Sequence, residues 1–323
     1  MGSRSVRKIR SMEDGAVAEV IGTILLVAVA IVVITGILAW YIPTTASSNE
    51  VQFQVAEKSA FSQAISMTNP QDLVNGTPVS LSFPLGIAGV PPFEPASATQ
   101  IFLSTSPSGY NSSVVLNVSY TVSNSTAHHT IYSDSSISSA GTLSSGSITQ
   151  YVASIAYIME DGSLIEAYGN GQVPSVLGSL PVAVSPGSLF IMQSGFVGSP
   201  STLTGTGSAT VTIDPVFTSD IEVQNNSLGS YAGQPVGISN ITLNSINYTI
   251  DSTYADGWDY SLYHEFNSST AGYNSVISIP AWNFSGYPIS VHYGKGTISI
   301  SSSKPIKLQV FRFLSVSFHF ESQ

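Results

Sequence analysis

Hydrophobic side chains are distributed unevenly along this chain, and their densest block occupies residues 16–42. Apolar residues fill nearly every position of this block, and Glu19 is its single charge. As a helix the block would extend about 40 Å at roughly 1.5 Å per residue, more than the roughly 30 Å hydrocarbon core of a bilayer. We therefore predict a membrane-spanning helix over 16–43 that Pro43 terminates, followed by a hinge over 44–50.

The rest of the chain replaces this continuous apolar run with alternation. Residues 114–122, 244–250 and 315–320 each alternate apolar and polar side chains, which is typical of half-buried strands. Apart from a short amphipathic turn around 56–67, no stretch after residue 44 has sustained helical spacing. The pattern predicts an α+β fold, with one long N-terminal hydrophobic helix followed by a mainly antiparallel β-sandwich region.

The β region is long enough to hold two sandwiches. Its best candidate seam is the Gly-, Ser- and Thr-rich stretch 194–208. We expect a β-sandwich domain over 51–195, and over 196–323 either a second β-sandwich domain or a continuation of the first.

Charge is scarce and unequally placed. Only 9% of residues are charged, and the formal net charge is −10. Nucleic acid is an unsuitable partner for such a chain, because phosphate binding requires clustered Lys and Arg. Four of the nine Lys and Arg residues lie within residues 4–10. By the positive-inside rule, this cluster keeps residues 1–15 in the cytoplasm and places 44–323 outside.

Gly15 separates the charged segment from the apolar run, so cleavage after it would make the hydrophobic helix the new amino terminus. An ordinary secretory signal has an apolar region of about 7–15 residues that precedes its cleavage site, and this run is too long for that. The order of the segments is that of a pilin-type signal. Residues 16–28, AVAEVIGTILLVA, resemble the amino-terminal segment of archaeal type IV pilins, and the resemblance extends over about residues 12–42.

The resemblance implies cleavage between Gly15 and Ala16 by a prepilin peptidase. It implies that the helix then leaves the membrane and packs with copies of itself in a filament, with the help of the pilus assembly machinery. Glu19 becomes a candidate for neutralising the amino terminus of a neighbouring subunit. The filament-core positions are then Glu19, Val20, Ile21, Gly22, Ile24, Leu25, Leu26, Val29, Val33, Gly36 and Leu38. An uncleaved single-span anchor with the same orientation is the alternative.

The external region contains nine Asn-x-Ser/Thr sequences, which are candidates for N-glycosylation of an exported surface. These candidates are Asn75, Asn111, Asn117, Asn124, Asn225, Asn240, Asn247, Asn267 and Asn283. The competing explanation is compositional, because a Ser-rich chain produces such sequences by chance.

A search for catalytic chemistry finds little. The five histidines form no spaced metal-ligand motif, no nucleophile elbow is present, and there is no Cys. Three carboxylates within 251–259 are compatible with a calcium loop but depart from its spacing, and an ordinary Asp-Gly turn is the simpler explanation. We therefore expect no enzymatic activity, no cofactor and no metal.

These observations lead us to expect a structural subunit of an extracellular archaeal type IV pilus. Its β region would be glycosylated and would serve surface adhesion, with a dense group of aromatic residues over 258–293 as a candidate adhesive patch. The alternative is a membrane-tethered extracellular protein that binds a solute or sugar.

Overall fold

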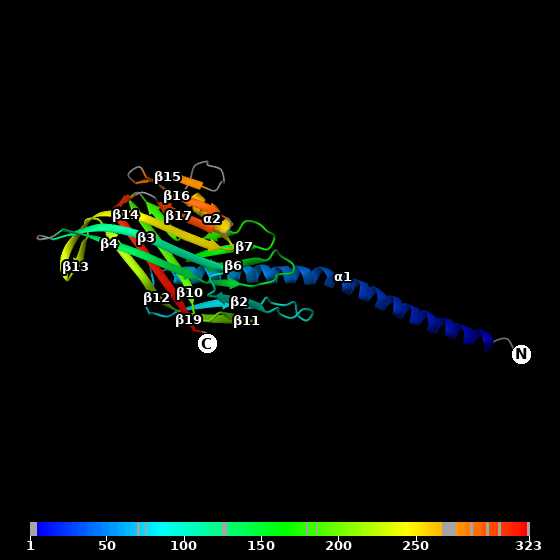
Figure 1. The fold of residues 1–323 in the computed structure, drawn as a ribbon. Helices are drawn as coiled ribbons and strands as arrows, with labels where there is room; N and C mark the ends of the chain where they lie inside the picture. Colours follow the sequence, from blue (N-terminus) through cyan, green and yellow to red (C-terminus); the bar gives the residue numbers. More distant parts are fainter. Residues whose placement is uncertain are drawn as a thin grey trace.

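The computed structural model describes residues 5–69, 72–74, 76–124, 128–178, 180–185, 187–266, 276–284, 287–294, 297–302 and 305–321. A long helix, α1 (Ser5–Met67), opens the fold and is followed by mostly antiparallel sheets in a sandwich-like arrangement. Figure 1 shows α1 in blue, with one part inside the β region and the other projecting far beyond it. The predicted α+β architecture is therefore confirmed.

Helix α1 continues through Pro43, so the prediction that this residue terminates the helix is wrong. Residues 44–50 are helical rather than a hinge, and 51–67 belong to α1 rather than to a β domain. A proline in a helix interior removes one hydrogen bond and clashes with the preceding turn, which costs roughly 3 kcal/mol. The helix continues because residues after Pro43 pack against the β region, and tertiary packing supplies most helix stability in proteins.

Within the described residues, the strands form three sheets. The five-stranded sheet contains, in spatial order, β1 (Val79–Pro84), β12 (Ser208–Gln224), β19 (Val310–Glu321), β10 (Ser188–Val197) and β9 (Val182–Ser185). The six-stranded sheet contains β11 (Ser201–Gly205), β2 (Thr99–Ser104), β5 (Thr142–Ser145), β6 (Ile155–Glu160), β7 (Ser163–Tyr168) and β8 (Ser175–Leu177).

The eight-stranded sheet is built around one very long strand, β14 (Gln234–Ser252). Its remaining members are β15 (Val276–Phe284), β16 (Tyr287–Gly294), β17 (Thr297–Ser302), β3 (Tyr110–Ser123), β4 (His128–Ala140), β13 (Leu228–Tyr231) and β18 (Ile306–Leu308). Strands β13, β17, β18 and β3 all pair with β14, at different positions along its length.

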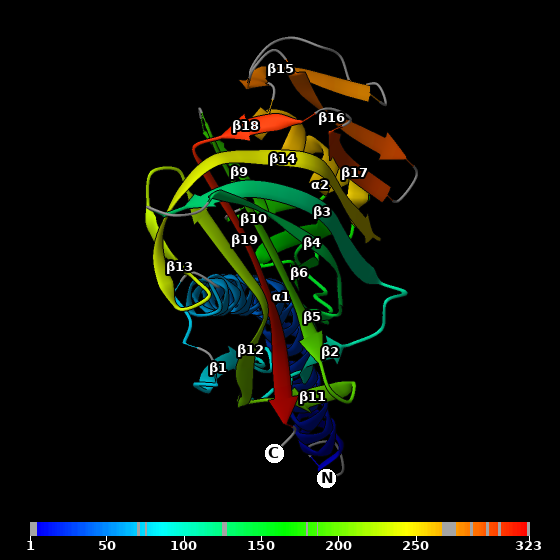
Figure 2. The same cartoon turned by 60° about the vertical axis from the view of Figure 1, so that its left-hand side comes forward.

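Strand pairing crosses the expected seam near residue 195. Strand β3 pairs with β14, β1 pairs with β12, and β10 lies parallel to β19. Figure 2 shows β10 and β19 side by side through the middle of the β region. Because these sheets draw strands from both sides of the seam, residues 196–323 continue the sheets of the first segment rather than forming a separate sandwich.

The predicted strand faces agree with the observed burial. In β3 the side chains of Leu116, Val118 and Val122 are buried, and in β14 those of Ile246, Tyr248 and Ile250 are buried. In β19 the apolar residues of 315–320 are buried as predicted, but Ser315 is buried as well. Its hydroxyl donates to Gln193 Oε1 and contacts the hydroxyl of Thr218, so this polar group is satisfied inside the core.

The buried apolar residues form two clusters, and β19 contributes to both. Phe311 and Phe313 belong to the cluster beneath β3 and β14, whereas Leu314, Val316 and Phe318 belong to the cluster that contacts α1. Residues of opposite parity on a strand point to opposite faces. The five-stranded sheet therefore joins the two cores.

A second helix, α2 (Ala255–Phe266), occupies the segment that we expected to be a turn or calcium loop. The expectation of a turn over 251–259 was therefore wrong for residues 255–259, which are helical. Trp258 and Leu262, four residues apart, are both fully buried and anchor the helix to the first cluster. Asp256 lies in the first turn of α2, where the positive end of the helix dipole stabilises a carboxylate.

Candidate functional site

The apolar half of α1, residues 19–42, extends away from the β region. Its most apolar stretch is long enough to cross a membrane, and none of that stretch is buried within the described chain. Leu26 is 69% exposed, Val32 71% and Trp40 69%. Soluble monomers rarely expose continuous apolar surface of more than a few hundred Å², so a surface of this kind marks a membrane or protein contact.

Hydroxyl groups within the apolar half are satisfied by the helix itself. Thr23 Oγ1 donates to the Glu19 carbonyl, and Thr35 Oγ1 donates to the Ile31 carbonyl, each at 2.8 Å. Thr44, directly after Pro43, makes the same bond to Trp40. A hydroxyl without a partner is costly in an apolar medium, and these internal bonds remove that cost.

Two glycines leave open positions on this surface. A Cβ atom placed on Gly22 or Gly36 would meet no described atom within 4 Å. No contact within the described chain requires a glycine at either position. Glycine lowers helix stability by about 1 kcal/mol relative to alanine. Small residues allow two helices to approach closely, which is a role that both positions could serve.

The second half of α1, residues 44–67, is embedded in the β region along one side only. Its buried residues recur every three or four positions, which is the spacing of a single helix face. They are Ala46, Glu50, Phe53, Glu57, Phe61 and Ala64, and Thr68 continues the series just beyond the helix. The two halves of one helix therefore have opposite environments.

Phe61 is the main apolar contact of this embedded half. It is fully buried, and its ring lies 5.0 Å from that of Phe83 in β1 and 6.0 Å from that of Tyr157 in β6. Such distances are typical of packed aromatic pairs. Phe61 therefore joins α1 to two different sheets.

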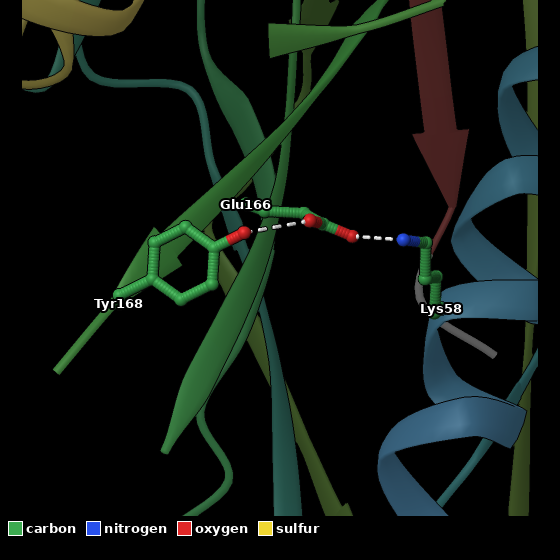
Figure 3. A network of polar contacts seen from close by, with 3 residues as sticks. All are labelled: Lys58, Glu166 and Tyr168. Atoms are coloured by element: carbon green, nitrogen blue, oxygen red, sulfur yellow. Dashed lines mark hydrogen bonds and ion pairs between the residues drawn. The ribbon is translucent and has the colours of Figure 1, made fainter. Parts of the chain in front are cut away.

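An ion pair fixes the same half of α1 to the six-stranded sheet. Lys58 Nζ lies 2.6 Å from Glu166 Oε1 in β7, and the Tyr168 hydroxyl donates to Glu166 Oε2 at 3.0 Å. Figure 3 shows Lys58 reaching from the helix toward these two strand residues. The Glu166 side chain is only 9% exposed, and these two partners offset the cost of burying its carboxylate.

Two glutamates of the buried stripe take part in this attachment. The Glu50 carboxylate accepts the backbone N–H groups of Gln150, Tyr151 and Val152 at 2.7–2.9 Å. Glu57 accepts from the Ser147 hydroxyl at 3.3 Å, and its Oε1 has no hydrogen-bond partner among the described residues. The loop between β5 and β6 is thus held on α1 by carboxylates.

A second pair of buried carboxyls lies away from α1, where β6 turns into β7. Glu160 Oε2 accepts from the Ser252 hydroxyl at 2.7 Å and from Trp258 Nε1 at 3.0 Å. Asp161 accepts from the Ser194 N–H at 2.5 Å and from the Tyr248 hydroxyl. Asp161 adopts a positive φ of 49° in the Asp-Gly turn, and its side chain is buried in the core.

Burial changes the acidity of both groups. Loss of solvent raises the pKa of Glu160 from its ordinary value of 4.5 to about 7, although the bonds from Trp258 and Ser252 oppose the shift. Loss of solvent also raises the pKa of Asp161 from 3.8 to about 7, opposed mainly by the bond from Tyr248. No described Lys or Arg forms an ion pair with either group. Both carboxyls therefore retain protons up to near neutral pH.

The predicted processing residues Gly15 and Ala16 lie within the helical backbone of α1, in the part whose side-chain surroundings are outside the description. The predicted filament-core residues from Glu19 to Leu38 all lie on the apolar half, where the large hydrophobic ones from Val20 to Val33 are exposed. All of these positions lie on the single helix α1. Cleavage and polymerisation stay predictions.

The structure describes the side chains of six glycosylation candidates, all of them in the β region. Asn111 and Asn117 lie in β3, Asn240 and Asn247 lie in β14, and Asn124 and Asn225 follow β3 and β12. Asn240 and Asn247 are exposed, and Asn240 has a positive φ of 56°. Asn283 lies in β15, but its side chain is outside the description, as are Asn75 and Asn267 entirely. Occupancy by a glycan stays a prediction.

In the described part of the chain, no group of three or more His, Asp or Glu side chains comes together in a way that could hold a metal ion. His128 and His129 are consecutive exposed residues of β4, and the His129 ring contacts that of Tyr231 at 5.6 Å. In the predicted aromatic patch, Trp258 is a core residue, whereas Tyr260 is 45% exposed.

A long apolar amino-terminal helix is present, as in pilins. No protein-family model, no curated protein and no solved structure matches the chain.

Sequence reasoning overlooked the attachment of residues 46–64 to the β region. Two of the buried positions, Glu50 and Glu57, are glutamates, so they interrupt the apolar spacing by which a buried helix face is recognised. The spacing of three and four residues from Ala46 to Ala64 is nevertheless intact. Allowing glutamate at stripe positions would have revealed it.

Proposed function

We propose that this chain is a structural subunit of an extracellular archaeal type IV pilus. The observation that carries the proposal is the apolar half of α1, which projects uncovered from a folded β region. In this proposal, residues 16–42 first cross the membrane and then pack with the same residues of other copies.

The apolar half of α1 exposes a hydrophobic surface that is costly to leave in water. Burial of apolar surface is worth about 25 cal/mol per Å², and exposed residues surround the helix from Val20 to Ile37. Because no polar face interrupts this surface, lipid or other helices have to cover it on all sides. Once the helix leaves the lipid, its apolar surface can be buried against the same helix of other copies.

The β region has a separate role in this proposal. It stays outside, attached to the helix by the buried stripe and the Lys58–Glu166 ion pair, and it forms the outer surface of the filament. The exposed sequons Asn240 and Asn247 would carry glycans, which would hydrate a surface with little charge. Adhesion to surfaces is the activity proposed for this outer layer.

The test begins with the mature amino terminus of the chain, produced in cells that contain a prepilin peptidase. Mass spectrometry is expected to find Ala16 as the first residue, and electron microscopy is expected to find filaments. Gly15→Leu is expected to abolish both, since a bulky residue blocks the junction. The matched control is Gly2→Leu, the same substitution at a glycine outside the junction.

Three results would contradict the proposal. One is an intact start at Met1 in a protein that remains in the membrane, which indicates a single-span anchor. Another is normal filaments from Gly15→Leu. The third is purified monomers that bind a sugar, which would favour the tethered binding protein.

A further inference from the structure

Two loops surround α1 at the point where it leaves the β region. One loop, 85–98, connects β1 to β2, and the other, 146–154, connects β5 to β6. Asn49 Nδ2 donates to the carbonyls of Ala88 and Gly89 in the first loop, each at 3.0 Å. The next residue, Glu50, accepts three backbone N–H groups of the second loop. Two consecutive helix residues therefore hold both loops in place.

A cavity of about 330 Å³ lies between these loops and the helix. Its lining includes Ala46 and Glu50 from α1, Ile87 and Pro95 from the first loop, and Ile148 and Tyr151 from the second. A volume of this size corresponds to on the order of ten water molecules at roughly 30 Å³ each. It is large enough to admit apolar side chains from outside.

Apolar side chains stand exposed on these same loops. Ile148 is 88% exposed, Phe93 49% and Tyr151 38%. We call these three residues the collar. Ala46, at the cavity wall, is only five residues beyond Tyr41, so the collar directly continues the exposed apolar surface of α1.

We propose that the collar and its cavity receive the apolar half of α1 from a second copy of this chain. The proposal rests on the proposed pilus function and adds a contact between the β region of one subunit and the helix of another. Because Asn49 and Glu50 hold the loops before binding, the surface loses little conformational freedom on contact.

Charge favours this occupant over an anionic one. Of the described residues that line the cavity, none is Lys or Arg, and two are glutamates. Glu50 is fully engaged with backbone N–H groups, whereas Glu94 Oε2 is buried without a hydrogen-bond partner among the described residues. Anionic lipid headgroups and nucleic acid would be repelled. Residues 20–42 carry no charge and avoid that repulsion.

The contact also limits how parallel subunits are displaced along the filament. Along the filament axis, Ala46 of one copy has to lie at the same height as a residue between 19 and 42 of another copy. At roughly 1.5 Å per residue, the axial displacement between such copies lies between about 6 and 40 Å. A displacement outside this range leaves the collar without an apolar helix.

The test places a photoreactive amino acid at position 148 of the full chain and irradiates purified filaments. Filaments assembled from isotopically light and heavy subunits distinguish crosslinks between copies from those within one. We expect mixed light–heavy adducts that join position 148 to a peptide within 16–42. The control is the same label at Leu228, which is 87% exposed in β13, and its adducts are expected to exclude that peptide.

A matched pair of substitutions gives a second readout. Ile148→Asp and Leu228→Asp each place a carboxylate on a highly exposed site, so neither disturbs the core. Ile148→Asp is expected to lower filament yield at least tenfold, with Leu228→Asp near the unsubstituted yield.

The outcomes separate the two proposals. Adducts of position 148 with lipid, with its own chain only, or with another β region overturn the collar contact, as does an unchanged yield of Ile148→Asp. In each of these cases filaments still exist, so the pilus function stands. An unsubstituted chain that forms no filaments in pilus-producing cells overturns the pilus function, and the collar contact with it.

Discussion

The two halves of α1 belong to one continuous helix, yet they are stabilised in different ways. Residues 44–67 use a narrow stripe of buried positions against the β region, and two of those positions are carboxylates. Residues 19–42 bury none of their most apolar stretch in the described chain, although they are far more hydrophobic. Hydrophobicity therefore does not identify the half that is buried in the subunit, whereas the spacing of burial does.

The two halves of α1 are suited to different surroundings. The stripe of the embedded half is specific to a partner within the same chain, because it matches Phe83, Tyr157 and the 146–154 loop. The exposed half has no such stripe, so it suits an environment that is similar in every direction. Lipid and a bundle of identical helices both have that property.

The strongest test of the comparison substitutes a large apolar residue in each half. Phe61→Ala is expected to lower the unfolding free energy of the β region by about 3–5 kcal/mol, because it leaves a cavity between α1 and two sheets. Ile34→Ala, at a residue that is 55% exposed, is expected to change it by less than about 0.5 kcal/mol. Urea denaturation of the detergent-solubilised chain, followed by tryptophan fluorescence, measures both. Equal effects would contradict the division into halves.

The next effect concerns pH and involves the buried pair Glu160 and Asp161 of the β region. The folded-state pKa values of Glu160 and Asp161 are raised to about 7, above those of the unfolded chain. Their contribution is therefore fully present below about pH 4 and is lost as pH rises through about 7, by a few kcal/mol in all. Urea denaturation between pH 4 and pH 8 measures this loss.

The isosteric variant Glu160→Gln/Asp161→Asn supplies the comparison for this pH effect. It cannot ionise at these two positions, so its unfolding free energy is expected to depend less on pH than that of the unsubstituted chain. Asp251→Asn, at an exposed position of β14, is the control and should keep the original profile. Parallel pH profiles for the double variant and the unsubstituted chain would disprove the role of the buried pair.

A smaller effect is expected from the ion pair that attaches the embedded half. Lys58→Met leaves Glu166 with its bond from Tyr168 but without its cation. Because the Lys58 side chain is 48% exposed, the loss is expected to be about 1 kcal/mol. Lys307→Met, at an exposed position of β18, serves as the control and should change stability by less than about 0.5 kcal/mol. Denaturation midpoints measure the difference.

The smallest effect on the β region is expected from Gly36→Leu in the exposed half. No described atom lies near its Cβ position, so the unfolding free energy of the β region should stay unchanged. Filaments, by contrast, are expected to disappear, because leucine prevents close approach of a second helix. Gly207→Leu is the control, since Gly207 is equally open but lies in the β region. Normal filaments from Gly36→Leu would remove close helix packing from the proposal.

Much of the fold could be predicted because alternation and burial share one physical cause. The faces of β3, β14 and β19 follow the sequence pattern, since an apolar side chain on a strand has to point toward a core. The end of α1 could not be predicted from Pro43 alone. The local cost of a proline is readable in the sequence, but the compensating contacts of Phe61 are with Phe83 in β1 and Tyr157 in β6, which come later in the chain.

The candidate site could likewise be predicted from the sequence only in part. The exposed apolar half could be located in full, because continuous hydrophobicity needs no tertiary partner to be recognised. The Glu160–Asp161 pair could not, because its burial arises from Tyr248, Ser252 and Trp258, which lie about ninety residues further along. Helix α2 was overlooked because the Asp256-Gly257 sequence near its start is also typical of a turn.

The continuity of α1 through Pro43 has a mechanical consequence. A flexible segment over 44–50 would let the β region change its orientation relative to the helix. Instead, α1 is one helix of 63 residues, about 95 Å long at 1.5 Å per residue, that continues from the apolar half into the β region. In the proposed filament, tension on residues 19–42 would reach Glu50, Phe53, Lys58 and Phe61 as shear along the helix axis. These contacts would then bear the force together.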